Sequence, residues 1–435
     1  MKSPLSKRRD AVIVGGGPAG AASALYLLKA GVTPLILEKE RFPRFHIGES
    51  LTGEVGGSLR ALGLEDWMNA QRWPIKHGVN VYGPNGKNSF WVPVKRRDQD
   101  KNLLDTTTWQ VRRSTFDQKL LDTAVERGAE LLPFRAVDVL LDGDRVTGVK
   151  VRTPEGKTEE LKAEVVVDAS GQSTFLANSS APMGDKGRGS YDKQLAVFSQ
   201  VVNAVRDPGE ASGNTLIFYR QKNHWAWFIP LDDEVTSVGV VVPGEYYNSQ
   251  KLSKHDFLVQ ELRALNCELA RRLPDLTFVE DVYSASNYSY HITQYTGKGF
   301  LCVGDSHRFI DPIFSFGVNF ALKDGEFATP AILQYLSGET SHLDNPFADY
   351  QSRSERGQNI IQDLVDVFWE HPLPFVMLVH QRHREGMIDM FAGRIFNDDI
   401  VDSPALHAMR KCKYKPAMMD KSGCTNDAAA PDCGH

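Results

Sequence analysis

The chain has 435 residues and a formal net charge of −5 at pH 7, with 41% apolar and 24% charged residues. These proportions are typical of a globular protein and exclude a collagen-like chain, a disulfide scaffold and a largely disordered chain. The mild acidity gives no reason to expect nucleic acid or an anionic membrane as a partner. At roughly 150 residues per domain, the length predicts two or three domains.

The sequence shows no targeting or metal-binding pattern. A short basic stretch leads directly into a strand, without the apolar core of a signal peptide. The longest apolar stretches are far shorter than the roughly 20 residues that a membrane span needs. The 5 cysteines are odd in number and lack CxxC spacing, which argues for a reducing compartment and against a zinc site. We therefore expect a cytoplasmic protein without a membrane partner or a metal site.

Residues 10–40 are predicted to form a βαβ unit. An apolar strand at 11–14 leads into a glycine-rich turn, and a second strand follows at 33–37. The helix between them, at 21–30, is rich in small apolar residues, which suits close packing on a sheet. This order of elements is typical of a nucleotide-binding domain.

The turn of this unit contains Gly15, Gly17 and Gly20 in GxGxxG spacing, and Glu38 ends the second strand. Gly15 permits a tight turn, Gly17 lets the backbone approach a pyrophosphate, and Gly20 lets the helix pack on the strand. The helix N-terminus then faces the phosphates, and Glu38 is placed to accept hydrogen bonds from an adenosine ribose. The alternative is a glycine-rich turn beside an exposed glutamate. This alternative does not explain why the strands, the turn, the helix and the acidic residue occur together.

The same kinds of pattern predict the later elements. A helix is predicted over 54–70, and a second one over 114–128, between a serine N-cap and a glycine. They are followed by an antiparallel meander at 133–167, a sheet-rich region at 195–245, a buried strand at 299–304, a helix from about residue 318 and further helices from about 345.

Two turns in these later elements point to FAD as the dinucleotide. Asp168 to Gly171 follow one apolar strand and Gly304-Asp305 follow another, so both lie at the carboxyl ends of strands, where ligands bind in a doubly wound sheet. With the glycine-rich turn, this set resembles the flavoprotein monooxygenases. The resemblance implies that Asp305 contacts the ribityl chain and that Arg113 lies near the cofactor. For Arg113, a surface ion pair is the alternative.

Two further motifs narrow the resemblance. Residues 225–230 read WxWxIP, and residues 309–317 read FxxPxxSxG. From the first strand to about residue 330, the sequence is similar to flavin-dependent halogenases. The resemblance implies an oxidoreductase that uses FADH₂, O₂ and chloride or bromide to halogenate an electron-rich aromatic ring.

The WxWxIP motif implies a partition between flavin and substrate. Trp225 and Trp227 are two residues apart on a strand and point to the same face. By the resemblance, they and Pro230 separate the flavin from the organic substrate. A core strand with two aromatic residues is the alternative.

The FxxPxxSxG motif implies a halide site. Exposed N–H groups at a helix start bind anions, and by the resemblance the amides of Phe316 and Gly317 hold chloride or bromide beside the flavin ring. Phe316 departs from the small residue usual at its position. Its bulk is expected either to narrow the halide pocket or to block the route out of it.

The family also relays hypohalous acid through a lysine, as a haloamine or by a hydrogen bond. Lys76, in WPIKHGVNVYG, is similar in position to this residue. A desolvated lysine has a depressed pKa and is a usable nucleophile at neutral pH. A surface lysine that enters a strand is the alternative. Tryptophan halogenases carry a glutamate where this chain has Phe314, so the resemblance favours a phenol or a pyrrole as substrate.

The stretch FPRFHIGES at 42–50 is another match, and its Gly48-Glu49-Ser50 turn is expected near the flavin; a loop with a capping serine is the alternative. Asn287 stands where some relatives carry an aspartate that links the flavin covalently, so non-covalent FAD is expected. The cofactor contacts implied by the resemblance are Gly15, Gly17, Ala19, Gly20, Glu38, Lys39, Gly48, Glu49, Ser50, Arg113, Asp305, Pro312, Gly317 and Val318.

The resulting fold prediction is an α/β protein built on a doubly wound, Rossmann-like FAD-binding domain, with an inserted mixed-sheet substrate domain and a helical C-terminal region. The expected boundaries are 1–185 and 286–345 for the FAD-binding domain, 186–285 for the substrate domain, 346–412 for the helical region and 413–435 for a disordered tail. The helical region is expected to cap the substrate pocket.

The expected partners follow from the same interpretation. No second nucleotide motif is visible, so a separate flavin reductase is expected to supply FADH₂. The substrate is either a free aromatic molecule or a ring tethered to an acyl or peptidyl carrier protein. The basic run at 95–97 either docks such an acidic carrier or is a solvated loop. An aromatic hydroxylase of the same fold and a flavin-binding relative without chemistry are the alternative functions.

Overall fold

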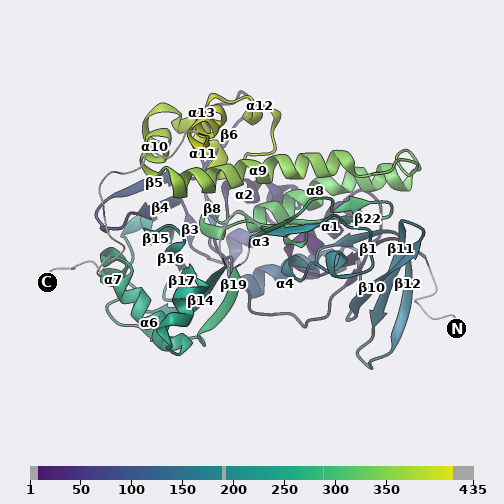
Figure 1. Ribbon diagram of the computed structural model, residues 1–435, viewed down its shortest axis with the longest axis horizontal. Helices are drawn as coiled ribbons and strands as arrows, with labels where there is room; N and C mark the ends of the chain where they lie inside the picture. Colours follow the sequence, from purple (N-terminus) through teal and green to yellow (C-terminus); the bar gives the residue numbers. More distant parts are fainter. Residues whose placement is uncertain (1–7, 189–192, 288, 415–435) are drawn as a thin grey trace.

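The computed structural model describes residues 8–188, 193–287 and 289–414 (Figure 1). Two large sheets lie next to each other along the long axis of the molecule, and the long helix α9 (Ala348–Glu370) runs above them (Figure 1). A group of shorter C-terminal helices lies beyond α9. The chain therefore forms two sheet-containing parts under a shared helical cover.

The first sheet has eight strands and a parallel centre in the order β9-β2-β1-β12-β22. Its register places Val14 of β1 beside Leu37 of β2 and Asp168 of β12, so the carboxyl ends of three strands meet at one edge. Beyond this centre, β12 continues into an antiparallel hairpin with β11 and β10. The strands are β1 (Arg9–Val14), β2 (Leu35–Leu37), β9 (Glu130–Leu132), β10 (Arg135–Asp142), β11 (Arg145–Arg152), β12 (Thr158–Asp168), β21 (Thr296–Gly297) and β22 (Phe300–Cys302).

The helices that flank this sheet pack closely. Helix α1 contacts both α4 and α8, and small residues such as Ala21 and Ala24 are fully buried at its core. Short side chains let helix and sheet backbones approach, which is why this segment forms the first helix of the fold. The flanking helices are α1 (Pro18–Lys29), α2 (Gly53–Ala61), α3 (Glu65–Ala70), α4 (Arg113–Glu126) and α8 (Gly317–Leu336).

The second sheet also has eight strands, in the order β18-β14-β17-β16-β15-β4-β5, with β19 on β14. Its neighbours are antiparallel except for β15 and β4. Trp225 and Trp227 face the main core, whereas Ala226 and Phe228 face a separate core. The elements are β4 (Gly78–Tyr82), β5 (Ser89–Pro93), β14 (Gln194–Val202), β15 (Thr215–Gln221), β16 (His224–Pro230), β17 (Thr236–Pro243), β18 (Thr277–Phe278), β19 (Tyr283–Asn287), α5 (Gly244–Gln250), α6 (Lys254–Ala264) and α7 (Cys267–Arg272).

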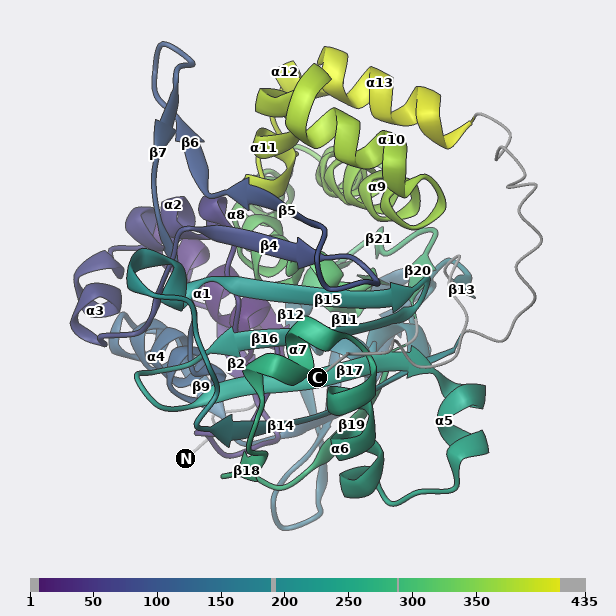
Figure 2. The same ribbon diagram turned by 90° about the vertical axis from the view of Figure 1, so that its left-hand side faces the viewer.

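Short elements connect the sheets to the helical cover. The hairpin of β6 and β7 projects beside α11 (Figure 2). These elements are β3 (Ile75–Lys76), β6 (Lys95–Arg97), β7 (Leu103–Asp105), β8 (Thr108–Trp109), β13 (Lys186–Arg188), β20 (Tyr290–Ile292), β23 (Arg308–Phe309), α10 (Pro372–Met377), α11 (Arg384–Ala392), α12 (Asp398–Val401) and α13 (Pro404–Lys413). A π-helical turn, η7 (Leu378–Arg382), joins α10 to α11.

The predicted fold class is confirmed: a doubly wound sheet, a mixed sheet and C-terminal helices are all present. The second sheet, however, extends beyond the predicted insertion, because β4 and β5 join its edge. The helix predicted over 54–70 is two helices, since Gly63 turns the chain with a φ of +69°. The helix predicted at 21–30 begins at Pro18, whose fixed φ suits the first helical turn. Of the predicted tail, Lys413 ends α13, and residues 415–435 lie outside the described residues.

Within the described ranges, no helix has the length and apolar character needed to cross a membrane. The same ranges contain no group of three or more His, Cys, Asp or Glu side chains arranged to hold a metal ion.

Candidate active site

The glycine-rich turn lies between β1 and α1, at the edge where the parallel strands end. Gly15 has a φ of +109°, and its N–H donates to the carbonyl of Leu37 over 2.9 Å. A Cβ at Gly20 would lie 1.9 Å from the carbonyl oxygen of Gly15, so only glycine fits there. At Gly17, the nearest heavy atom to an added Cβ is Nη2 of Arg44, 3.4 Å away. The turn thus leaves room beside a guanidinium group, which suits a pyrophosphate.

Glu38 holds this turn in place. Its carboxylate accepts hydrogen bonds from the N–H of Gly16 and the N–H of Glu40, both 2.7 Å long, and the residue is 9% exposed. Ala19 is buried at the start of α1, and Lys39 is exposed just beyond the end of β2. Glu38 therefore shapes the turn as well as lying at the edge where a ribose is predicted to bind.

Arg113 is buried rather than on the surface, so the surface ion pair considered for it is wrong. Its guanidinium forms a bidentate ion pair with Asp117, with distances of 2.7 and 3.0 Å, and donates to the carbonyl of Ile47 over 2.7 Å. It also lies close enough to Asp305 to oppose the effect of burial, which raises the pKa of the Asp305 carboxyl to about 7. The structure thus brings together two predicted cofactor residues from distant parts of the sequence.

The residues of the turn at 48–50 face two different environments. Gly48 has a φ of +99°, and a Cβ there would lie 2.8 Å from Nη1 of Arg113. Glu49 is 3% exposed, and burial raises the pKa of its carboxyl, while Ser237 and Arg113 act in the opposite direction. The hydroxyl of Ser50, which is also expected near the flavin, accepts a hydrogen bond from Lys76 Nζ. Glu49 therefore faces the side of Arg113, and Ser50 faces the lysine.

The two tryptophans of WxWxIP form a continuous buried wall on β16. The ring centroids of Trp225 and Trp227 lie 6.0 Å apart, and Trp227 Nε1 donates to Ser237 Oγ over 3.1 Å. Pro230, at the end of the strand, is also buried. Ser237 also acts to lower the pKa of the Glu49 carboxyl through a hydrogen bond. The two tryptophans and the 48–50 turn therefore share Ser237 as a neighbour. The predicted partition residues thus lie on the second sheet, on the strand that pairs with the strand of Ser237.

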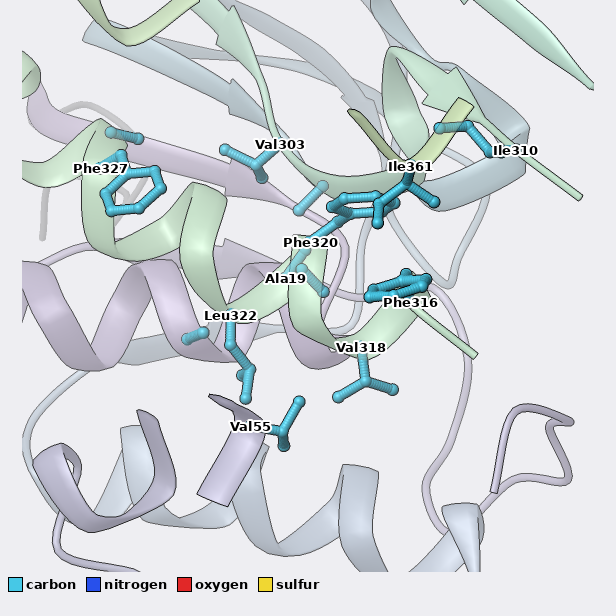
Figure 3. Close-up of a cluster of buried hydrophobic side chains, with 14 of the residues drawn as sticks. Ala19, Val55, Val303, Ile310, Phe316, Val318, Phe320, Leu322, Phe327 and Ile361 are labelled. Carbon is cyan, nitrogen blue, oxygen red and sulfur yellow. The ribbon is translucent and has the colours of Figure 1, made fainter. Parts of the chain in front are cut away.

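The FxxPxxSxG loop leads directly into α8. Ser315 has a φ of +61°, and Phe316 is the N-cap residue of the helix. A Cβ at the exposed Gly317 would meet no heavy atom within 4 Å. Pro312 is exposed, whereas Val318 is 6% exposed and packs below the helix near Val55 (Figure 3). The helix start is therefore exposed at Gly317, while Phe316 and Val318 on either side of it are buried.

The side chain of Phe316 is part of the core. It is 4% exposed, and its ring lies 6.1 Å from that of Phe320, on the side of α8 that faces Ile361 (Figure 3). Figure 3 also shows Val318 on the other side of the helix. The bulk of Phe316 is thus taken up by packing between α8 and α9.

Lys76 is buried on the two-residue strand β3. It is 2% exposed, and its Nζ donates to Ser50 Oγ over 2.8 Å and to the carbonyl of Leu51 over 2.9 Å. Burial lowers the pKa of the ammonium to about 7. A surface lysine is excluded, and near pH 7 a large share of Lys76 is the neutral amine.

Lys76 opens onto a cavity between the second sheet and the C-terminal helices. The cavity is lined by Thr52, Gly53, Lys76, Val79, Val92, Pro93, Val94, Phe314 and Phe391. Phe314 packs edge to face against Phe391, with centroids 4.9 Å apart, and stacks with Phe375 at 6.3 Å. The amine thus lies beside a small cavity whose walls include the rings of Phe314 and Phe391.

Comparison with known proteins identifies the family of the chain. The family model described as FAD binding domain matches residues 8–362. The chain is 36% identical to a 1H-pyrrole-2-carbonyl-(peptidyl-carrier protein) brominase from Pseudoalteromonas luteoviolacea, over 92% of this chain and 95% of the relative. The structure of the flavin-dependent brominase Bmp2 superimposes with a TM-score of 0.86 at 37% identity, covering 93% of this chain and 98% of Bmp2. The chain is a flavin-dependent halogenase.

A second relative is a chlorinase rather than a brominase. It is a 1H-pyrrole-2-carbonyl-(peptidyl-carrier protein) chlorinase from Pseudomonas fluorescens, 28% identical over 89% of this chain and 90% of the relative. The halogenase therefore uses FAD, O₂ and a halide. The residues fit the cofactor: Gly17 leaves space beside Arg44, and a buried Arg113 faces Glu49 and Asp305.

The basic run at 95–97 is mostly structural in this halogenase. Lys95 pairs with Asp105 over 2.5 Å, and Arg97 pairs with Asp389 over 2.7 Å, so only Arg96 is fully exposed. The interpretation as a solvated loop therefore fits only Arg96. The ion pairs of the other two residues hold the β6–β7 hairpin in place.

Three residues of the site had no recognisable pattern in the sequence. Gln110 and Thr215 form hydrogen bonds beside Ser50, and Phe391 lines the cavity from α11. They belong to no motif, and only the three-dimensional fold brings them to Lys76. The side chain of Asn287, on which non-covalent attachment of FAD was based, lies outside what the structure describes.

Proposed function

We propose that this halogenase chlorinates or brominates a pyrrole ring that is tethered to a carrier protein, and that Lys76 delivers the halogen. The observation that carries the proposal is the buried Lys76 amine, which faces a cavity lined by Phe314 and Phe391. The relatives named as acting on pyrrole-2-carbonyl carrier proteins support the substrate class.

When bound as FADH₂, the cofactor and O₂ supply the oxidising equivalent that converts halide to hypohalous acid. A separate flavin reductase provides FADH₂ in this proposal. The residues that would hold the cofactor are those around the glycine-rich turn, together with Arg113, Glu49 and Asp305. FAD is held without a covalent link.

The start of α8 supports halide binding. Gly317 is exposed, a Cβ there would meet no heavy atom within 4 Å, and the N-terminus of a 20-residue helix favours an anion. In our proposal, the amides of Phe316 and Gly317 hold the halide, and the Phe316 ring only anchors the helix start. Trp225, Trp227 and Pro230 keep the substrate ring away from the flavin.

The neutral Lys76 amine then holds the hypohalous acid. Either it attacks the halogen, forming an N–halogen bond and releasing water, or it accepts a hydrogen bond from the acid. The halogen next transfers to the ring, and the ring loses its proton. A pyrrole is electron-rich enough to react without the glutamate that Phe314 replaces, which supports this substrate class.

The experiment combines the protein with FAD, an independent flavin reductase, NADH, bromide and catalase. Pyrrole-2-carbonyl carrier protein and a panel of free phenols are supplied in parallel, and products are identified by mass spectrometry. Lys76→Ala is compared with Lys222→Ala, because Lys222 is an exposed lysine paired with Glu370.

We expect a brominated carrier-bound pyrrole from the parent protein and from Lys222→Ala, and none from Lys76→Ala. Bromination that survives in Lys76→Ala would remove Lys76 from the mechanism. A hydroxylated product without halogen would replace this proposal with the hydroxylase. Bromination of free phenols alone would exclude the tethered pyrrole.

A further inference from the structure

The segment of residues 372–382, which consists of α10 and the π-helical turn η7, packs directly on the cavity of Lys76. Phe375, on its inner side, is fully buried. The Phe375 ring stacks with that of Phe314 at 6.3 Å and meets that of Phe391 edge to face at 6.2 Å. Phe314 and Phe391 both line the cavity, so the 372–382 segment forms the layer outside it. Both views of the molecule show α10 and α11 beside β5, the edge strand of the second sheet (Figure 1, Figure 2).

The opposite face of the 372–382 segment is exposed and apolar. Leu373 and Met377 lie one helical turn apart and are 79% and 41% exposed. Pro372 and Pro374 flank Leu373 and are exposed as well. In the described ranges, no other large hydrophobic side chain is as exposed as Leu373. Apolar side chains that gather on one face, rather than being scattered singly, indicate a surface that a partner covers.

The start of this segment is rigid. Pro372 is the first residue of α10, and Pro374 also lies in its first turn, where backbone N–H groups have no partner inside the helix. Proline fixes φ, so the backbone on both sides of Leu373 is held in one conformation. Leu378 and Val379 are buried on the inner side and anchor the other end. A partner therefore meets a preformed surface and has little chain to order on binding.

Positive charge lies at the C-terminal end of the same segment. Arg382 ends η7 and Arg384 begins α11, and both are exposed. The nearest carboxylates on α11, those of Glu385 and Asp389, are engaged by Arg97. Within the part of the chain that the structure describes, Arg382 and Arg384 have no carboxylate partner of their own. The surface therefore carries uncompensated positive charge, although the whole chain has a net charge of −5.

We propose that the carrier protein that delivers the tethered ring docks on this surface, the docking face. The docking face consists of Pro372, Leu373, Pro374, Met377, Arg382 and Arg384. The partner that fits it presents apolar side chains to Leu373 and Met377 and carboxylates to the two arginines. The inference rests on the proposed function, because only a tethered substrate needs a carrier.

The position of the docking face agrees with what a tethered ring requires. The arm between carrier and ring has a limited length, so the carrier has to dock next to the cavity that the ring enters. Phe375 lies between the docking face and two walls of this cavity. An acidic carrier that approaches this face is attracted by the arginines before contact, which raises the rate of association.

Two other arrangements fit less well. The β6–β7 hairpin carries a basic run, but Lys95 and Arg97 are already paired, and only Arg96 of the run is fully exposed. An anionic membrane is disfavoured by the net negative charge of the chain. Two exposed large apolar side chains are also few for insertion into a bilayer.

The experiment measures binding of the FAD-loaded protein to an immobilised carrier by biolayer interferometry. The probe is the peptidyl carrier protein that serves the Pseudoalteromonas luteoviolacea brominase, loaded with pyrrole-2-carbonyl. We expect Leu373→Ser to raise Kd at least about fivefold, the effect of losing an energetically important interface contact. Arg382→Glu combined with Arg384→Glu should slow association about tenfold and weaken its dependence on salt.

The matched controls are Leu141→Ser and Arg96→Glu. Leu141 is 43% exposed on β10 of the first sheet, and Arg96 is an exposed cation on the neighbouring hairpin. Both controls should keep the Kd of the parent protein. Every substituted side chain is exposed, so thermal unfolding should show all variants to be folded. Loss of binding in Arg96→Glu, with unchanged binding in the docking-face variants, would overturn the proposal in favour of the hairpin.

Steady-state bromination of the same carrier-bound pyrrole separates docking from chemistry. Docking-face variants should raise KM and leave kcat within about twofold. If the parent protein brominates this substrate and the variants keep its KM and Kd, the docking face is wrong and the proposed function stands. If the variants lose carrier binding but Lys76→Ala still brominates, the docking face stands and the lysine relay fails. A parent protein that does not bind the loaded carrier overturns the inference, and bromination of free phenols alone then overturns the tethered substrate as well.

Two other occupants of the docking face have their own measurements. Light scattering detects a dimer of the parent protein that Leu373→Ser dissociates. Sedimentation with vesicles of phosphatidylcholine and phosphatidylserine detects membrane binding. We expect neither, and either one in the absence of carrier binding would overturn the proposal.

Discussion

Arg97 and Asp389 form a bidentate ion pair that fastens the β6–β7 hairpin to helix α11. Arg97 Nε lies 2.9 Å from Asp389 Oδ1, and Arg97 Nη2 lies 2.7 Å from Asp389 Oδ2. Phe391, two residues further along α11, lines the cavity of Lys76. The pair therefore fixes one wall of this cavity from outside it.

Replacing Arg97 by alanine leaves Asp389, which is 5% exposed, without its bidentate partner. We expect a loss of about 2–3 kcal/mol in the free energy of unfolding, measured by urea denaturation, and a higher KM for the substrate. Lys95→Ala removes an exposed pair on the same hairpin and should cost less than about 1 kcal/mol. Equal losses of unfolding free energy in both variants would contradict a larger contribution from the Arg97–Asp389 pair.

Gly20→Ala should abolish binding of FAD. The new Cβ would meet the Gly15 carbonyl at 1.9 Å and push the glycine-rich turn out of shape. Quenching of FAD fluorescence measures the change, and we expect at least about a tenfold rise in Kd, since tenfold corresponds to 1.4 kcal/mol. Gly57→Ala is the control, because a Cβ there meets nothing within 4 Å. Retained affinity in Gly20→Ala would contradict the assignment of the turn.

Lys76→Met should stabilise the fold, and more so at pH 7 than at pH 10. The folded-state pKa of Lys76 is about 7 against 10.5 in the unfolded chain, so the unfolded state binds more protons between these values. The penalty for the buried lysine is therefore largest at and below pH 7 and fades as the pH rises toward 10.5. Thermal unfolding of both proteins across this range tests the sign. A gain that does not depend on pH would show that the lysine has the same pKa in the folded and the unfolded protein.

Phe316→Leu tests how the start of α8 serves the halide. Its ring packs against Phe320, so the variant should lose about 1–2 kcal/mol of stability, less than a truncation to alanine. If the backbone amides hold the halide, KM for bromide should change less than twofold. Steady-state bromination at varied bromide concentration measures this. A large change in KM would place the side chain itself in the halide pocket.

The local motifs predicted the arrangement of the first sheet and of the turns at the carboxyl ends of its strands. GxGxxG, the strand ends and the turn at Asp305 are short-range patterns, and the parallel register brings them to one edge as expected. The burial of Lys76 also followed the resemblance. The roles predicted for these residues depend on residues close to them in the sequence, so short motifs are enough to predict them.

The environment of Lys76 could not be predicted in the same way. Ser50 belongs to the loop that contacts the predicted cofactor side, yet its hydroxyl turns to the lysine. Gln110 directly follows β8 and Thr215 begins β15, and the two meet only because β4 pairs with β15 while β3 pairs with β8. Pairing between strands so distant in sequence is set by tertiary packing, and no periodicity or spacing marks the partners.

The pairing of β4 with β15 also bears on how the protein matures. Residues 78–82 can dock only after residues 215–218 have formed their strand, whereas the first βαβ unit is made of neighbouring segments. Contacts between near neighbours close faster than contacts across long stretches of chain. A nascent chain can therefore complete its glycine-rich turn well before Lys76 is sealed from water. Synthesis of the second sheet is the step that completes the surroundings of Lys76.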